Sequence, residues 1–146
     1  MIRPALAADR ARIEAIVGAA YSPYLERMDR PPAPLLDDYA RRIADGQTHV
    51  LEESGEILGL VVLEPCEDFL LLDNIAVDPA CHGRGLGKRL MAFTETEARR
   101  QGYAAVELYT NEVMVENIAR YRHLGYVETK RVQVAGYDRV YLRKAL

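Results

Sequence analysis

The sequence has 146 residues, 49% of them hydrophobic, so we expect one folded domain over residues 1–146. Its formal net charge of −3 argues against a nucleic-acid partner, which would favour a basic surface. No apolar stretch approaches the ~18 residues that a membrane-spanning helix needs, and the N-terminal segment is charged where a signal peptide would be apolar.

The first third of the chain reads as a short strand followed by helices. The expected elements are a strand over 2–5, a helix over 9–20 and a second helix over 36–44. Asp9 is a suitable N-cap for the first helix. The region 21–44 is a candidate lid over a substrate site. Tyr21 and Tyr24 are candidate contacts in it, although tyrosines so placed more often pack than bind.

Strands over 49–52 and 57–63 follow, joined by a hairpin turn at 53–56. The next strand covers 69–77 and is apolar except for Asp73 and Asn74. By two-residue alternation, Asp73 shares a strand face with Leu71 and Ile75. A carboxylate in such a run is costly unless it faces a cleft or a partner, so Asp73 is either functional or a buried hydrogen-bonding group.

Three glycines at alternate positions, Gly83, Gly85 and Gly87, follow this strand, and the apolar spacing then becomes helical. A strand, a glycine-rich turn and a helix place backbone amides and a positive helix N-terminus where a phosphate group can bind. Arg84 and Lys88 add positive charge at the same place. Some of these glycines are expected to adopt positive φ, which other residues rarely do.

This loop matches neither of the two commonest nucleotide motifs. Lys88 is followed by Arg89, which offers no hydroxyl for magnesium, and the spacing Gly-x-Gly-x-Gly differs from Gly-x-Gly-x-x-Gly. It resembles instead the acyl-CoA loop of the Gcn5-related N-acetyltransferases, Gln/Arg-x-x-Gly-x-Gly/Ala, with His82 in place of the usual first residue. A nucleotide-binding protein is therefore disfavoured.

The second half of the chain extends this resemblance. A strand is expected over 105–110, a helix over 111–121 and a terminal hairpin of 126–134 with 140–143. Residues 110–126 look like a second motif of the same family, in which Asn117 precedes Tyr121 by four residues and Gly125 and an aromatic follow. The resemblance covers nearly the whole chain. It implies a mixed α/β fold, with a mostly antiparallel sheet of about six or seven strands whose fourth and fifth strands splay apart, flanked by about four helices.

The resemblance also implies a cosubstrate, acetyl-CoA, and the groups that bind it. Backbone groups of the fourth strand would pair with the pantetheine arm, amides of the loop would hold the pyrophosphate, and an asparagine would contact the arm. The expected cofactor-binding residues are Ile75, Ala76, Val77, His82, Gly83, Arg84, Gly85, Leu86, Gly87, Lys88, Asn117 and Tyr121.

The resemblance also makes Tyr121 the expected proton donor to the departing thiolate, a role for which the pKa values of a phenol and a thiol are similar enough. The alternative is that Tyr121 fills the core against Ile118 and Tyr126. The base that deprotonates the amine is Asp73 or Glu112, and the two alternatives stay open. Asn74 and Asn111 are candidate substrate-orienting residues.

The leading interpretation is an N-acetyltransferase that acts on a primary amine by direct attack in a ternary complex. The alternative is a non-catalytic acyl-CoA-binding sensor of the same fold. Small amines, amino acids, antibiotics and peptide N-termini are all compatible acceptors, with contacts expected from 21–44 and 135–138. A monomer or a homodimer is expected.

The cysteines and histidines suggest no metal site. Cys66 and Cys81 match no metal or redox spacing, and His49, His82 and His123 are scattered along the chain. We therefore expect a reduced, cytoplasmic protein without a metal ion.

Overall fold

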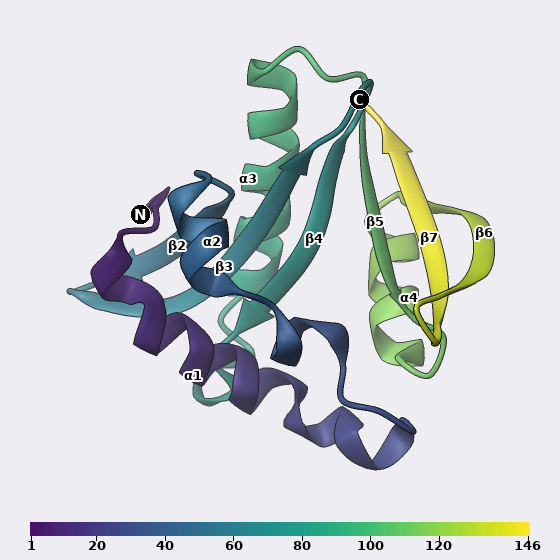
Figure 1. Cartoon of the computed structure of the whole chain (residues 1–146). Coiled ribbons are helices and arrows are strands. Elements are labelled where there is room, and N and C mark those ends of the chain that lie inside the picture. The colour runs from purple at the N-terminus through teal and green to yellow at the C-terminus, as the bar shows by residue number, and fades with distance from the viewer.

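Seven strands form one sheet in the computed structural model, which describes residues 1–146 (Figure 1). Their order across the sheet is β1-β2-β3-β4-β5-β7-β6, and every neighbouring pair is antiparallel except β4 and β5. The strands are β1 Ile2–Pro4, β2 Thr48–Glu53, β3 Glu56–Pro65, β4 Leu70–Val77, β5 Ala105–Asn111, β6 Val127–Val134 and β7 Tyr137–Ala145. The predicted mixed, mostly antiparallel architecture is confirmed.

Two helices cover each face of this sheet (Figure 1). On one face α1 Arg10–Tyr21 and α2 Tyr39–Ala44 enclose a core with β2 and β3. On the other, α3 Leu86–Arg100 and α4 Val115–His123 cover a larger core. Short 3-10 helices occupy much of the link between α1 and α2. None of the helices is long and apolar enough to cross a membrane.

Strands β4 and β5 part from each other halfway along their length. They pair only from Leu70 with Val106 to Leu72 with Leu108, yet they continue to Val77 and Asn111. In Figure 1 the two strands lie side by side at one end and spread toward the other. The predicted splay is confirmed, and it leaves backbone groups of both strands without a neighbouring strand.

A β-bulge at Asp73 lies at the start of this opening. Leu63 of β3 pairs with Leu72, whereas Val62 pairs with Asn74, so Asp73 is the extra residue. Because the bulge shifts the alternation, Leu72 and Ile75 both pack against the core on the α3 side. The predicted sharing of one face by Asp73 and Ile75 is therefore wrong.

Two helix starts also differ from the predicted ones. Helix α2 begins at Tyr39, because the Asp38 side chain caps the Arg41 amide. Helix α4 begins at Val115 rather than at 111, because the Asn111 side chain accepts a hydrogen bond from the Val113 amide and forms a local turn instead. Both predicted hairpin turns are present.

Candidate active site

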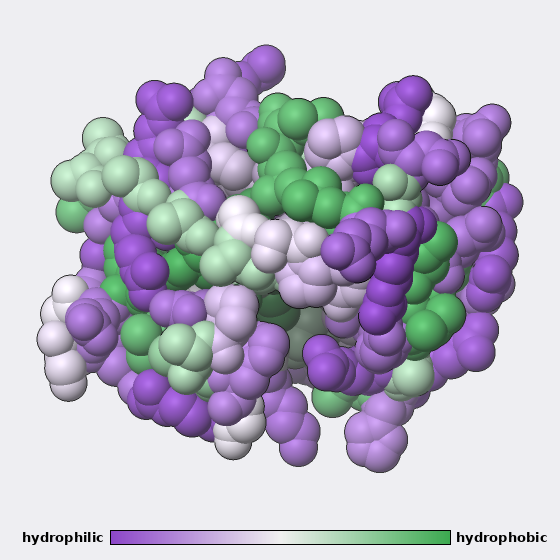
Figure 2. Space-filling view, turned by 90° about the horizontal axis from the view of Figure 1, so that it is seen from below, coloured by the Kyte–Doolittle hydropathy of each residue, from purple (hydrophilic) through white to green (hydrophobic).

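Two cavities meet at the opening between β4 and β5. The larger one, the loop cavity, has a volume of about 660 Å³ and lies between the glycine loop and α4. The smaller one, the cleft cavity, has a volume of about 50 Å³ and lies between the parted strands. Figure 2 shows the molecule hollowed near the middle of the face seen from below. The two cavities share Ile75, Asn117 and Tyr121.

The glycine loop borders the loop cavity as the start of a helix. Gly83 and Gly85 have φ of +85° and +74°, which confirms the expected positive φ, whereas Gly87 lies within α3. A Cβ built on any of the three would meet no protein atom within 4 Å, so the loop leaves space in front of its backbone. The side chains of His82 and Lys88 line the same cavity.

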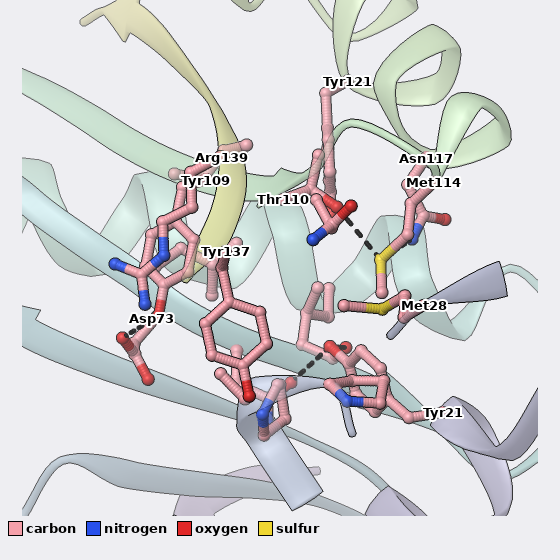
Figure 3. A pocket seen from close by; sticks show the side chains of 18 residues that line it. Tyr21, Met28, Asp73, Tyr109, Thr110, Met114, Asn117, Tyr121, Tyr137 and Arg139 are labelled. Atoms are coloured by element: carbon pink, nitrogen blue, oxygen red, sulfur yellow. Dashed lines mark hydrogen bonds between the residues drawn. The ribbon is translucent and has the colours of Figure 1, made fainter. Parts of the chain in front are cut away.

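The cleft cavity is narrow because the α1–α2 link and β7 close over it. Met28 from the link and Tyr137 from β7 lie across the cavity from residues of β4 and β5 (Figure 3). Pro32 and Pro34 of the link also line the cavity. The link and the start of β7 thus line one cavity, and each includes part of the segments 21–44 and 135–138 from which acceptor contacts are expected.

Direct contacts tie the link to the other side of the cleft. The Tyr137 hydroxyl donates to the Pro31 carbonyl at 2.6 Å, and the Arg30 guanidinium donates to the Ala135 carbonyl at 2.7 Å. Arg27 also pairs with Glu116 of α4 at 3.0 Å. These contacts form a bridge across the mouth of the cleft.

Tyr121 projects from α4 to the junction of the two cavities (Figure 3). Its ring packs edge-on against Tyr126, with ring centres 6.3 Å apart, and it contacts the α3-side core. Burial raises the pKa of Tyr121 to about 12, so its hydroxyl stays protonated at neutral pH, and no protein hydrogen bond accounts for that shift. Tyr121 therefore combines the packing role with access to the cleft.

Asp73 lies at the cleft with a carboxylate that is largely buried. Its Oδ1 accepts a hydrogen bond from the Tyr109 hydroxyl at 2.7 Å, and its Oδ2 lies 3.2 Å from the Arg42 guanidinium. Burial raises the pKa of Asp73 above its usual value, and the hydrogen bond from Tyr109 and the charge of Arg42 oppose that rise. Asp73 is thus a fixed, hydrogen-bonded carboxylate beside the cavity.

Asn74 anchors a buried chain of hydrogen bonds under the cleft. The Tyr21 hydroxyl donates to Asn74 Oδ1 at 2.6 Å, and the Asn74 amide donates to the Tyr39 hydroxyl at 3.0 Å. The Tyr21 hydroxyl also lies 3.2 Å from the Ile75 carbonyl oxygen. A hydroxyl has one hydrogen, and the shorter contact assigns it to Asn74 Oδ1, so the Ile75 carbonyl keeps its capacity to accept from a ligand. Tyr21 and Asn74 thus shape the cleft floor.

The structure leaves four predicted residues outside both cavities. Ala76 packs in the core on the α1 side, because the bulge turns Ile75 and Val77 toward the loop cavity. The Arg84 guanidinium points away to Glu53 at 2.7 Å. Tyr24 packs near Tyr21, with ring centres 6.3 Å apart, and lines neither the cleft cavity nor the loop cavity.

Glu112 is the fourth of these residues. It is exposed, and its charge acts on Arg131 of β6, which is an edge strand of the sheet. Its backbone amide donates to the Asp138 carbonyl at 2.9 Å, which fixes the end of β5 against β7. Glu112 is therefore not among the residues that line the cavity of Asp73, although the preceding residue, Asn111, is.

Sequence reasoning missed Tyr109 and Arg139, which line the cleft cavity, whereas Tyr137, which also lines it, lies within the segment 135–138 that was singled out. For Tyr109 there was a signal, since it lies two residues from Asn111 on the same face of β5. For Arg139 there was none, because only the pairing of β7 with β5, which sets Arg139 opposite Asn111, brings it to the cleft.

The comparisons with known proteins agree with this arrangement. A family model described as "Acetyltransferase (GNAT) family" matches residues 13–126. Mycothiol acetyltransferase of Segniliparus rotundus is 40% identical over 65 residues, which are 44% of this chain and 24% of that protein. The uncharacterized N-acetyltransferase YjgM of Escherichia coli is 33% identical over 81 residues, 53% of this chain and 48% of that protein. The chain thus spans at most about half the length of these curated relatives.

Solved structures share the fold over nearly all of the chain. The PaiA N-acetyltransferase from Thermoplasma acidophilum, solved in complex with coenzyme A, superposes with a TM-score of 0.82 at 14% identity, covering 100% of this chain and 98% of that one. A ribosomal-protein-alanine N-acetyltransferase from Brucella melitensis gives a TM-score of 0.75 at 23% identity, covering 100% and 99%. At such identities the likeness establishes the fold.

Proposed function

This chain belongs to the GNAT acetyltransferase family, and on that premise we propose that it transfers the acetyl group of acetyl-CoA to a primary amine. The observation that carries the proposal is the junction of the two cavities at Tyr121, where a ligand in the loop cavity meets a second ligand in the cleft cavity. Direct transfer needs both substrates in contact at one point. We propose that residues 1–146 act as one catalytic domain.

The residues of the loop cavity fit the phosphates of acetyl-CoA. Gly83, Gly85 and the N-terminus of α3 offer backbone amides and a positive helix end, and Lys88 and Arg120 add charge on the same cavity. Arg84 is paired with Glu53, so we do not assign it a role in binding the phosphates. The volume of about 660 Å³ accommodates an extended cosubstrate.

The parted strands give the acyl end a place to bind. Beyond Leu72 the edge of β4 that faces β5 has no strand partner, so its backbone groups are available to a ligand. A free amide on this edge would stabilise the oxyanion that forms at the thioester carbonyl. Asn117 lines the loop cavity and, in this proposal, contacts the arm that carries the thioester.

Asp73 is the proposed base. It lines the cleft cavity, whereas Glu112 does not, and burial raises its pKa toward the range of a useful base. Asp73 takes a proton from the acceptor ammonium, directly or through a water molecule. Tyr109 and Arg42 hold the carboxylate in place and act as positioning residues.

Tyr121 is the proposed acid. The amine nitrogen forms a bond to the acyl carbon, the bond from that carbon to sulfur breaks, and the electron pair leaves with sulfur. Tyr121 donates its proton to the thiolate and recovers one from the nitrogen as the amide forms. The other proton, held by Asp73, passes to solvent. The overall products are an amide, free CoA thiol and one proton.

The proposal is tested by measuring acetyl-CoA binding and amine-dependent thiol release separately. We expect binding by titration calorimetry, and thiol release that depends on a primary amine. Binding without release for alkylamines, amino acids and peptide N-termini would support the sensor alternative. No binding of acetyl-CoA would overturn the assignment of the loop cavity.

A further inference from the structure

Arg139 differs from the other arginines of this chain. Most of them pair with a carboxylate within 4 Å. The arginines without such a partner are Arg30, Arg99, Arg120 and Arg139. Three of these are exposed to water, whereas Arg139 is half-buried. A guanidinium that has lost part of its hydration without gaining a counter-ion is unfavourable, so Arg139 is a candidate ligand-binding group.

The surroundings of Arg139 hold it in position without neutralising it. Its guanidinium carbon lies 4.1 Å from the centre of the Tyr109 ring, and one nitrogen lies 3.4 Å from the Tyr141 hydroxyl. The nearby carboxylate of Asp73 is engaged by Tyr109 and Arg42 instead. Figure 3 shows the guanidinium beside Tyr109, on the Asp73 side of the cavity. Stacking orients the guanidinium while leaving donors for an anion.

The charge count favours a carboxylate as that anion. Arg139 is the one cationic side chain that lines the cleft cavity, so it matches one negative charge rather than a phosphate dianion. The planar fork of a guanidinium also matches the two oxygens of a carboxylate. Asp73, on the same cavity, supplies the complementary site for an ammonium group.

We propose that the acceptor is a free amino acid, whose carboxylate binds Arg139 while its amine faces Asp73 and Tyr121. This inference rests on the proposed acetyl transfer and names the acceptor class for the same site. A further cavity of about 440 Å³ opens beyond Tyr137 and shares Arg139 and Asp73 with the cleft cavity. It offers space for the amino-acid side chain.

The bridge across the cleft supports a small acceptor rather than a peptide. The contacts of Tyr137 with Pro31 and of Arg30 with Ala135 close the space above the narrow cleft cavity. An extended chain running through the cleft would have to break both. A peptide N-terminus would also lack a carboxylate near its amine, leaving Arg139 unpaired.

The test compares amino acids with their primary amides, which differ only in the carboxylate. Thiol release from acetyl-CoA is measured for the L-amino acids, for amino acids with longer amine-to-carboxylate spacing and for the matching amides. We expect kcat/KM for the preferred amino acid to exceed that of its amide by at least about tenfold. We expect Arg139→Gln to abolish this preference by lowering kcat/KM for the amino acid. Arg139→Lys, which keeps the positive charge, should retain part of the preference.

The control is Arg143→Gln, on the same face of β7 but paired with Glu107 and outside all three cavities. We expect Arg143→Gln to keep the preference for the amino acid over its amide. We also expect every variant to bind acetyl-CoA with unchanged affinity. The inference would be overturned if the amides were acetylated as well as the amino acids. It would also be overturned if Arg139→Gln retained the preference for the amino acid.

If no amine is acetylated, the proposed acetyl transfer fails, but the acceptor site can still be tested separately. For that test the amino acids are titrated into the CoA-saturated protein. Binding that requires both the carboxylate and Arg139 would still support the site. The absence of such binding would overturn it.

Discussion

The Tyr109 hydroxyl of β5 donates a hydrogen bond to the Asp73 carboxylate of β4 at 2.7 Å, just beyond the last paired residues of the two strands. The backbones have parted at this point, so side chains carry the contact between the strands. A carboxylate at the bulge is thereby fixed at the edge of the cleft. The placement of the proposed base depends on this bond.

Removing the hydroxyl with Tyr109→Phe is expected to change the pH dependence of turnover. The hydrogen bond from Tyr109 lowers the pKa of Asp73, so its loss raises that pKa. A base must be deprotonated to act, so the acid limb of the kcat profile moves to higher pH. Tyr141→Phe, which removes the hydroxyl of a neighbouring ring and spares Asp73, should leave the limb in place. An unmoved limb in Tyr109→Phe would exclude Asp73 as the base.

The variants Gly85→Ala and Gly87→Ala distinguish an effect on folding free energy from an effect on acetyl-CoA affinity. Gly85 has a φ of +74°, so alanine there costs about 1 kcal/mol of folding free energy, whereas Gly87 lies in a helix and tolerates alanine. Both methyl groups project into open space at the loop cavity. We expect thermal unfolding to show destabilisation of Gly85→Ala alone, and calorimetry to show weaker acetyl-CoA binding for both. Unaltered affinity in both variants would contradict a phosphate site at this loop.

Arg84 of the glycine loop and Lys88 of the first turn of α3 are expected to contribute differently to acetyl-CoA binding. Lys88 lines the loop cavity, whereas Arg84 is paired with Glu53. Lys88→Gln should weaken acetyl-CoA binding by about threefold to tenfold at low salt, less at high salt. Arg84→Gln should change the affinity by less than about twofold, because only an exposed ion pair is lost. The reverse order would show that Arg84 turns toward the ligand.

Tyr137→Phe tests the bridge over the cleft. The variant loses the 2.6 Å hydrogen bond to the Pro31 carbonyl, worth about 1 kcal/mol. We expect a severalfold higher KM for the acceptor, because the bridge closes the acceptor side, with unchanged affinity for acetyl-CoA. Tyr24→Phe, which alters a tyrosine outside both cavities, serves as the control. Equal effects of the two substitutions would argue against a role for the bridge in acceptor binding.

Much of the fold was predictable because its signals are local. The glycine loop, the hairpin turns and the alternation of polar and apolar residues each depend on residues close in sequence. The bulge at Asp73 was not predictable, because it arises from the register of β4 against β3. Because of that register, Ile75 packs against the core on the α3 side of the sheet, and Ala76 packs in the core on the α1 side.

The candidate site was predictable where backbone or a motif defines it. The glycine loop and Tyr121, which motifs had singled out, line the loop cavity. The acceptor side was not predictable in detail, since Arg139 reaches it through the pairing of β7 with β5, far from Asp73 in sequence. The exposed position of Glu112, outside both cavities, was not predictable for a similar reason, because the end of β5 is fixed by its contact with β7.

The measurement that tests the central claim most directly is single-turnover thiol release by Tyr121→Phe, with acetyl-CoA affinity measured in parallel. Tyr121 lies where the two cavities meet, and the phenol is its one group that can supply a proton. We predict a fall in turnover of about 100-fold with an acetyl-CoA affinity within about twofold of the unmodified protein. Turnover equal to that of the unmodified protein would contradict the account and leave Tyr121 as a packing residue.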